Sequence, residues 1–211
     1  MSKLYYTPTS CGASSFICAF IGNLNFDCEV VDLATHKTES GIDFYTINPK
    51  GNVPCIILED NTILNENISC LEYIADLSFK NGINLSPESQ SSERYLLTQI
   101  LSFIASELHA TIGLLFNPAT VGKIRDFVLK NFDRKMIYLE KYILNTPQFV
   151  LGDSFTIADA YLHIVLSWTG YVGIDLSKYQ IAQNYYSNIC NLPLVKMAKN
   201  RMSSIPERIL N

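Results

Sequence analysis

The first third of the chain alternates short apolar runs with segments of helical periodicity. Strands are expected at residues 3–6, 28–33, 55–58 and 62–64, the last two forming a hairpin. Helices are expected at residues 13–22, 43–47 and 67–77. In the last of these, apolar residues recur with the 3.6-residue spacing of an amphipathic helix. This order predicts an α/β domain with a small mixed sheet.

The pattern changes near residue 79. Residues 79–92 are rich in Asn, Ser, Gly and Pro and lack helical periodicity, which is typical of a linker. Beyond it, amphipathic helices are expected at residues 93–116, 122–144, 156–168, 177–191 and 194–202. We therefore predict a first domain over 1–79, a linker over 80–90 and an all-helical domain over 91–211.

A local motif marks the start of one of these helices. Thr156-Ile157-Ala158-Asp159 has the form of a capping box, in which the first and last side chains satisfy each other's backbone N–H groups. This structural role is a better interpretation of Asp159 than a catalytic acid.

Composition narrows the class of protein. The chain has 211 residues, of which 48% are hydrophobic and 17% charged, so it can build a sizeable core. The formal net charge of −4 disfavours a nucleic-acid partner, because such proteins usually carry a basic face. His36, His109 and His163 lack metal-ligand spacing, so no metal is expected.

The cysteines and the N-terminal sequence indicate the cellular compartment of the protein. The six cysteines form no C-x-x-C pair, which favours reduced thiols in a cytoplasmic protein. Met1 leads directly into a strand without a basic-then-apolar leader. No apolar run approaches the length that spans a bilayer, so no membrane partner is expected.

Cys11 is the first candidate for chemistry. It follows a strand and the turn over residues 7–10, and it opens an apolar helix. The N-terminus of a helix favours negative charge, which can lower a thiol pKa and expose a reactive thiolate. The alternative is a small buried hydrophobic residue of the core. Its position leaves both interpretations open.

Val53-Pro54 enters a strand directly after a glycine-containing turn. If this peptide bond is cis, the backbone N–H and C=O of Val53 point outward and can pair with an extended peptide. The alternative is an ordinary trans turn proline. Further along, Glu66 and Asn67 precede a helix whose free N–H groups could hold a carboxylate, while Glu66 accepts from an ammonium. Simple N-capping by Asn65 or Asn67 is the alternative.

These segments together resemble the bacterial glutathione S-transferases, most closely the beta class, over nearly the whole chain. The similarity lies in the opening Lys3-Leu4-Tyr5-Tyr6, the position of Cys11, the segments 31–33, 48–51 and 53–54, and Leu151-Gly152-Asp153. The resemblance implies a thioredoxin-like first domain followed by a helical domain, the glutathione S-transferase fold. It further implies a homodimeric enzyme that joins the glutathione thiolate to small hydrophobic electrophiles.

The resemblance also implies residue roles. The catalytic candidates are Cys11, Tyr6, Ser10 and His109. The glutathione-binding candidates are Cys11, His36, Lys37, Val53, Pro54, Glu66, Asn67, Glu107 and His109. Either His36 or Lys37 would meet the glycyl end of glutathione. The class often has a basic residue after the histidine, whereas this chain has Ala110.

Two other functions stay open. Cys11 has no C-x-x-C partner, which still permits glutathione-dependent thiol–disulfide exchange by a monothiol mechanism. Cys11 would then be the nucleophile and would form a mixed disulfide with glutathione. The chain could also be a non-catalytic scaffold of the same fold. The sequence does not name the electrophile.

Overall fold

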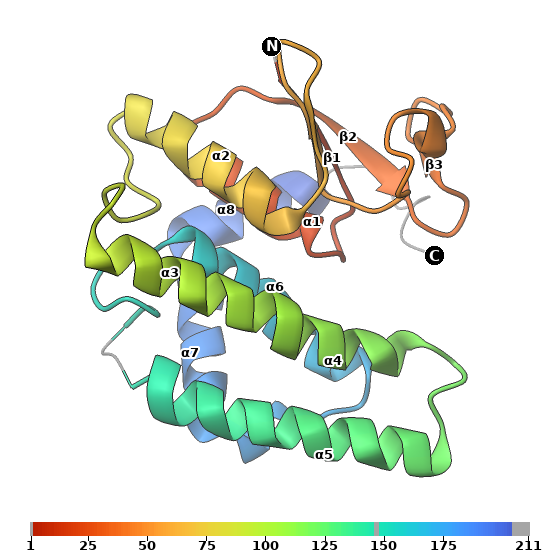
Figure 1. Cartoon of the computed structure of the whole chain (residues 1–211), viewed down its shortest axis with the longest axis vertical. Coiled ribbons are helices and arrows are strands. Elements are labelled where there is room, and N and C mark those ends of the chain that lie inside the picture. The colour runs from red at the N-terminus through yellow and green to blue at the C-terminus, as the bar shows by residue number, and fades with distance from the viewer. Residues whose placement is uncertain (1, 146–147, 204–211) are drawn as a thin grey trace. The chain divides into compact units, whose positions relative to one another are not determined.

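The computed structural model describes residues 2–145 and 148–203 (Figure 1). The chain divides into two compact units. The first unit holds residues 1–86 and those from 192 onward, and the second holds residues 87–191. The division at 86/87 falls inside the expected linker. The last helix, which we expected in the second domain, groups with the first unit because it packs against α1.

The first unit contains a five-stranded mixed sheet. Its strands are β1 (Lys3–Tyr6), β2 (Asp27–Asp32), β3 (Lys37–Thr38), β4 (Cys55–Ile57) and β5 (Ile63–Leu64), in the spatial order β3-β2-β1-β4-β5. β1 and β2 are parallel, and the other neighbours are antiparallel. The expected α/β domain is confirmed. β3 was missed because two residues carry no recognisable periodicity.

Helices of the first unit pack around this sheet. They are α1 (Gly12–Ile21), the short 3₁₀ helix η1 (Phe44–Thr46), α2 (Asn67–Lys80) and α8 (Pro193–Ser203). α1 packs against β1, α2 and α8. Ile17 on α1 and Ile74 on α2 are completely buried, so these helices turn their apolar faces inward.

The second unit is helical, as expected. Its elements are α3 (Ser92–Phe103), the π-helix η2 (Ile104–His109), α4 (Ala110–Gly113), the 3₁₀ helix η3 (Leu114–Phe116), α5 (Gly122–Tyr138), the π-helix η4 (Leu139–Ile143), α6 (Ile157–Tyr171), the 3₁₀ helix η5 (Leu176–Lys178) and α7 (Gln180–Asn191). The expected helix over 93–116 is therefore one helical run with a π segment inside it. The spacing of apolar residues along the sequence does not distinguish one turn of π-helix from the α-helix around it.

The capping box at the start of α6 is present. The buried carboxylate of Asp159 accepts from the Thr156 N–H and hydroxyl, each at 2.8 Å. It also accepts from the Val150 N–H at 2.9 Å and the Tyr185 hydroxyl at 2.8 Å. These four donors act against the desolvation of the carboxyl, although burial still raises its pKa, and they make Asp159 a structural residue.

The run Ser92–Phe116 corrects one expectation. By length and composition alone it could cross a membrane, so an apolar run of that length does exist in the chain. However, 44% of its apolar window is buried inside the protein, and Leu97, Leu101 and Leu108 of this run are completely buried. A core helix of a globular domain passes the same test, because its buried face is as apolar as a membrane span.

Candidate functional site

Cys11 stands at the N-cap of α1, and its side chain is only 9% exposed. Its thiol donates to the carbonyl oxygen of Val53 at 3.4 Å. Burial raises the pKa of the Cys11 thiol to about 12, although the N–H groups of Cys11 and Gly12 act in the opposite direction. The expectation that the helix start lowers this pKa was wrong. Desolvation of the thiolate outweighs the helix dipole here.

The peptide bond between Val53 and Pro54 is cis, which decides between the two alternatives that the sequence left open. The start of α1 lies directly against this bond. A Cβ atom at Gly12 would lie 3.1 Å from Cβ of Tyr6 and 3.4 Å from the backbone nitrogen of Pro54. A side chain there would force the neighbouring backbone to move, so glycine permits the close approach of α1 to this loop.

An amide network supports the loop before Val53. Asn48 is completely buried, and its side-chain nitrogen donates to the carbonyl of Asn52 at 2.7 Å and to its Oδ1 at 2.9 Å. The Oδ1 of Asn48 accepts from the Asn65 side chain at 3.0 Å. This network ties the Val53 loop to the residue before Glu66. Sequence reasoning missed it, although the asparagine-rich segments 48–52 and 65–67 carried the signal.

Glu66 and Asn67 meet at the start of α2 but play different parts. The Glu66 side chain is 65% exposed and pairs with the ammonium of Lys50. Its charge also contributes to the raised pKa of Cys11, so the two side chains act within one site. Asn67 is buried, and its Oδ1 accepts from the hydroxyls of Ser14 at 3.3 Å and Ser15 at 3.2 Å. Its side chain therefore joins α2 to α1.

Of the two candidate hydroxyls, Ser10 is hydrogen-bonded within the fold and Tyr6 is buried. The Ser10 hydroxyl donates to the Thr7 carbonyl at 2.9 Å and accepts from the Gly12 N–H at 3.1 Å. The Tyr6 ring is fully buried and stacks on Phe16 with centroids 4.8 Å apart. Burial raises the pKa of the Tyr6 hydroxyl, which has no hydrogen-bond partner among the described residues. Their roles as thiolate donors remain predictions.

His36 is the member of the His36-Lys37 pair that contacts the loop before Val53. Its Nδ1 lies 3.1 Å from the Gly51 carbonyl oxygen, and its ring lies 4.5 Å from that of Tyr45. Gly51 has φ +65°, and a Cβ there would lie 2.5 Å from the Tyr45 ring. Only glycine fits this turn. Lys37, in contrast, lies in β3 with its side chain exposed.

His109 belongs to the second unit, at the end of the π-helix η2. Its Nδ1 lies 2.6 Å from the Tyr161 hydroxyl, and its ring meets Trp168 edge-on at 4.8 Å. Trp168 in turn contacts the half-exposed Phe116, with centroids 6.0 Å apart. Burial lowers the pKa of His109, which keeps the imidazole neutral at neutral pH.

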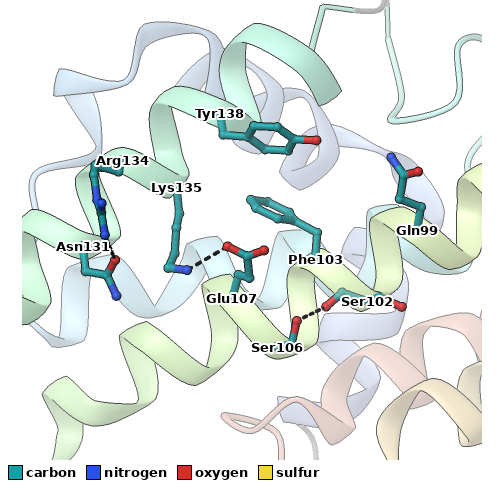
Figure 2. Close-up of a pocket in the computed structure, with 9 residues that line it drawn as sticks. All are labelled: Gln99, Ser102, Phe103, Ser106, Glu107, Asn131, Arg134, Lys135 and Tyr138. Carbon is teal, nitrogen blue, oxygen red and sulfur yellow. Dashed lines mark hydrogen bonds and ion pairs between the residues drawn. The ribbon is translucent and has the colours of Figure 1, made fainter.

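Glu107 lies in a groove of the second unit of about 620 Å³, between α3–η2 and α5 (Figure 2). Its carboxylate pairs with the Lys135 ammonium at 2.8 Å. The rings of Phe103 and Tyr138 face each other beside this pair, with centroids 5.0 Å apart. The groove thus combines a charge pair with an aromatic pair.

The structure brings most of the candidates of the first unit into one site. Cys11, Val53 and Pro54 meet at the start of α1, and Glu66 and Asn67 join them from α2. Among the described residues there is no group of three or more His, Cys, Asp or Glu side chains that could hold a metal ion.

Comparisons with known proteins agree with this arrangement. The chain is 33% identical over 196 residues to the glutathione S-transferase GstA of Escherichia coli O157:H7, covering 93% of this chain and 96% of that protein. No family model matches the sequence.

Two solved structures are also similar. One is a sphingomonad glutathione S-transferase complexed with glutathione, 35% identical with a TM-score of 0.87, covering 95% of this chain and 98% of the other. The second is the beta-class glutathione S-transferase of Sphingomonas chungbukensis, 34% identical with a TM-score of 0.87, covering 96% and 100%. The chain therefore belongs to the glutathione S-transferase family, with bacterial beta-class enzymes among its structural neighbours.

Proposed function

We propose that this glutathione S-transferase joins the sulfur of glutathione to small hydrophobic electrophiles. The observation that carries the proposal is the hydrogen bond from Cys11 to Val53, in the same unit as the exposed carboxylate of Glu66. A thiol, a backbone edge and a carboxylate suit the three polar parts of a γ-glutamyl tripeptide.

In this proposal each part of glutathione has its own partner. The backbone N–H and C=O of Val53 pair with those of the cysteinyl residue, as in a one-residue addition of a strand to the sheet edge. The Glu66 carboxylate receives the γ-glutamyl ammonium, displacing Lys50, and the free N–H groups at the start of α2 receive the γ-glutamyl carboxylate. His36, next to Gly51, meets the glycyl end.

The raised pKa of Cys11 decides how its sulfur acts. At neutral pH a thiol with a pKa of about 12 is protonated. In the proposed complex its one proton turns from the Val53 carbonyl, which then accepts from the cysteinyl N–H, to the glutathione sulfur and stabilises its thiolate. Lowering the pKa of the bound glutathione thiol by about two units corresponds to about 2.7 kcal/mol of preferential stabilisation of its thiolate. The thiolate then attacks the electrophilic carbon, a C–S bond forms, the leaving group departs with its electron pair, and the thiol proton goes to solvent.

Burial of the Cys11 thiol favours conjugation over the alternative, thiol–disulfide exchange. In that reaction Cys11 must itself become a thiolate and attack a disulfide sulfur. A buried protonated thiol is a poor nucleophile, because the thiolate is the reactive form. Conjugation needs only the donor form, which is the form that burial favours.

The proposal also covers the second unit and the assembly. We propose that His109 and the neighbouring Phe116 contribute to binding of the electrophile, as the family resemblance implies.

We propose a homodimer in which one subunit's first unit contacts its partner's second unit, with the groove around Glu107 as the contact surface (Figure 2). A cytoplasmic location suits six free thiols.

Calorimetric titration with glutathione tests the proposal, followed by a conjugation assay with a chlorodinitrobenzene. We expect saturable heat and enzyme-dependent product formation. Folded protein that takes up no glutathione at millimolar concentration would refute the binding site and leave the scaffold interpretation. Sedimentation equilibrium tests the dimer separately: we expect twice the 23.8 kDa chain mass, and a monomer at micromolar concentration refutes it.

A further inference from the structure

Glu29 is a buried carboxylate that the proposed chemistry does not use. It lies in the middle of β2, and the residue is only 7% exposed. One of its carboxylate oxygens accepts from the Lys3 ammonium at 2.7 Å. The other accepts from the Ser40 N–H at 3.0 Å and from the Ser40 hydroxyl at 2.5 Å. A buried carboxylate is stable only where donors surround it, so its burial and its bonds to Ser40 depend on each other.

The bonds to Glu29 are bonds to a charge. Although burial acts to raise it, hydrogen bonds from Lys3, Ser40 and Thr38 lower the pKa of Glu29 to about 2. The side chain is therefore a carboxylate at neutral pH. Hydrogen bonds to an ionised acceptor are roughly twice as strong as neutral ones, so Glu29 is a strong anchor for Ser40.

Ser40 lies at the tip of a hairpin whose base carries His36. Between residues 36 and 44 the chain folds back on itself. The Thr38 N–H donates to the Ile42 carbonyl at 2.9 Å, and the Phe44 N–H donates to the His36 carbonyl at 2.8 Å. The two limbs of this hairpin therefore move together, and what holds its tip also orients its base.

The base and the tip of the hairpin are fixed in different ways. At the base, Phe44 is completely buried in the apolar core of the first unit. At the tip, Ser40, Gly41 and Ile42 are all exposed. Backbone pairing of β3 with β2 holds one limb, and the bonds to Glu29 add the connection at the turn itself. Apolar burial cannot supply that connection, because the residues of the tip face solvent.

His36 needs this support. Its φ of +51° lies in the left-handed region, which costs free energy for a residue with a Cβ atom. Its Nδ1 nevertheless lies 3.1 Å from the Gly51 carbonyl oxygen, in the loop that leads to Val53. A strained residue keeps its conformation only where the surrounding structure fixes it, so the hairpin determines where the His36 ring lies.

We propose that Glu29 is a positioning residue for glutathione binding: through Ser40 it fixes the hairpin of residues 36–44, which holds His36 at the glycyl end of glutathione. This inference rests on the proposed function, in which His36 meets that end. It deepens the proposed function by naming the group that lets the site distinguish glutathione from γ-glutamylcysteine, which lacks the glycyl residue.

Calorimetric titration with these two ligands tests the inference. The wild type should bind glutathione more tightly than γ-glutamylcysteine. Glu29→Ala removes the whole anchor and should weaken glutathione binding about tenfold, with a change of less than about twofold for γ-glutamylcysteine. Ser40→Ala removes only the hydroxyl bond and should weaken glutathione binding about threefold. Because Ser40 is exposed, this variant keeps the test decisive if Glu29→Ala does not fold.

Two controls separate positioning from a general loss of structure. Lys3→Gln removes the other partner of Glu29 and leaves the bonds to Ser40, so it should keep the wild-type ratio of the two affinities. In a His36→Ala protein, Ser40→Ala should have no further effect, because the anchor acts through His36. A purely structural role would weaken the binding of both ligands equally.

The outcomes distinguish this inference from the function on which it rests. If the wild type binds glutathione but the Glu29 and Ser40 variants keep its ratio of affinities, the inference is overturned and the proposed function stands. Additive effects of Ser40→Ala and His36→Ala overturn it in the same way, since independent effects mean that Ser40 does not act through His36. Wild-type protein that takes up neither ligand refutes the proposed function and the inference together.

Discussion

The Cys11 thiol and the Val53 carbonyl oxygen are hydrogen-bonded at 3.4 Å. The two residues are 42 positions apart, and the bond joins the start of α1 to the cis-proline loop. In the proposed complex the same backbone carries the cysteinyl residue of glutathione. The thiol of Cys11 is thereby held next to the place that the reacting sulfur must occupy.

Cys11 should behave as a thiol and not as a thiolate. Its pKa of about 12 predicts no ionisation step of this residue at neutral or mildly alkaline pH. The measurement is thiolate absorption in the ultraviolet as a function of pH, taken as the difference between the wild type and Cys11→Ser. Because burial raises the pKa, the thiolate should appear only above about pH 10. A step near neutrality would show that the helix dipole prevails after all.

Replacing Cys11 separates the two reactions. Serine retains a hydrogen-bond donor, so Cys11→Ser should conserve conjugation of an aryl halide within about threefold, while any disulfide reduction disappears. Cys11→Ala removes the donor and should lower kcat/KM about tenfold, since a hydrogen bond to a charged acceptor contributes about 1.5 kcal/mol or more. Its pH–rate profile should shift to higher pH. If both variants lose conjugation completely, Cys11 takes part as a nucleophile.

Glu66 should matter for glutathione affinity. Glu66→Gln removes the partner of the γ-glutamyl ammonium and should raise the KM for glutathione about tenfold, with a smaller effect on kcat. Lys50→Gln is the matched control, because it removes the ammonium that occupies Glu66 in the free protein. It should leave the KM unchanged or lower it. An increase in KM for Lys50→Gln would mean that the ion pair itself builds the site.

His36 and Lys37 can be distinguished directly. His36→Ala should weaken glutathione binding, because its ring contacts Gly51 in the loop that leads to Val53. Lys37→Ala, in β3, should have little effect. Titration with glutathione and with γ-glutamylcysteine, which lacks the glycyl residue, provides the readout. The His36 variant should lose its difference between these two ligands, and a loss confined to the Lys37 variant would reverse the assignment.

Asp159 should be essential for stability and not for chemistry. Asp159→Asn places an amide opposite four donors, and we expect a loss of about 3 kcal/mol or more in the free energy of unfolding. The exposed Asp153→Asn is the control and should stay within about 0.5 kcal/mol of the wild type. Urea unfolding measures both. A stable Asp159→Asn protein with lost activity would contradict the structural role.

Local sequence predicted what local physics decides. The apolar runs of β1 and β2, the periodicity of α2 and the capping box before α6 were all readable, because each depends on neighbours within a few residues. β3 and the π segments were not readable, since they are too short or too subtle to change the hydrophobic period. The family resemblance rested on the order and spacing of such local motifs.

The chemical state of the site was decided only by tertiary structure. The helix start at Cys11 suggested a lowered pKa, but segments distant in sequence bury its thiol and reverse the direction. The amide of Asn67 was a candidate ligand group until Ser14 and Ser15 engaged it from α1. Desolvation and hydrogen-bond competition depend on which residues meet in space. The sequence by itself therefore determined the elements and the family, whereas packing determined which groups remain free to act.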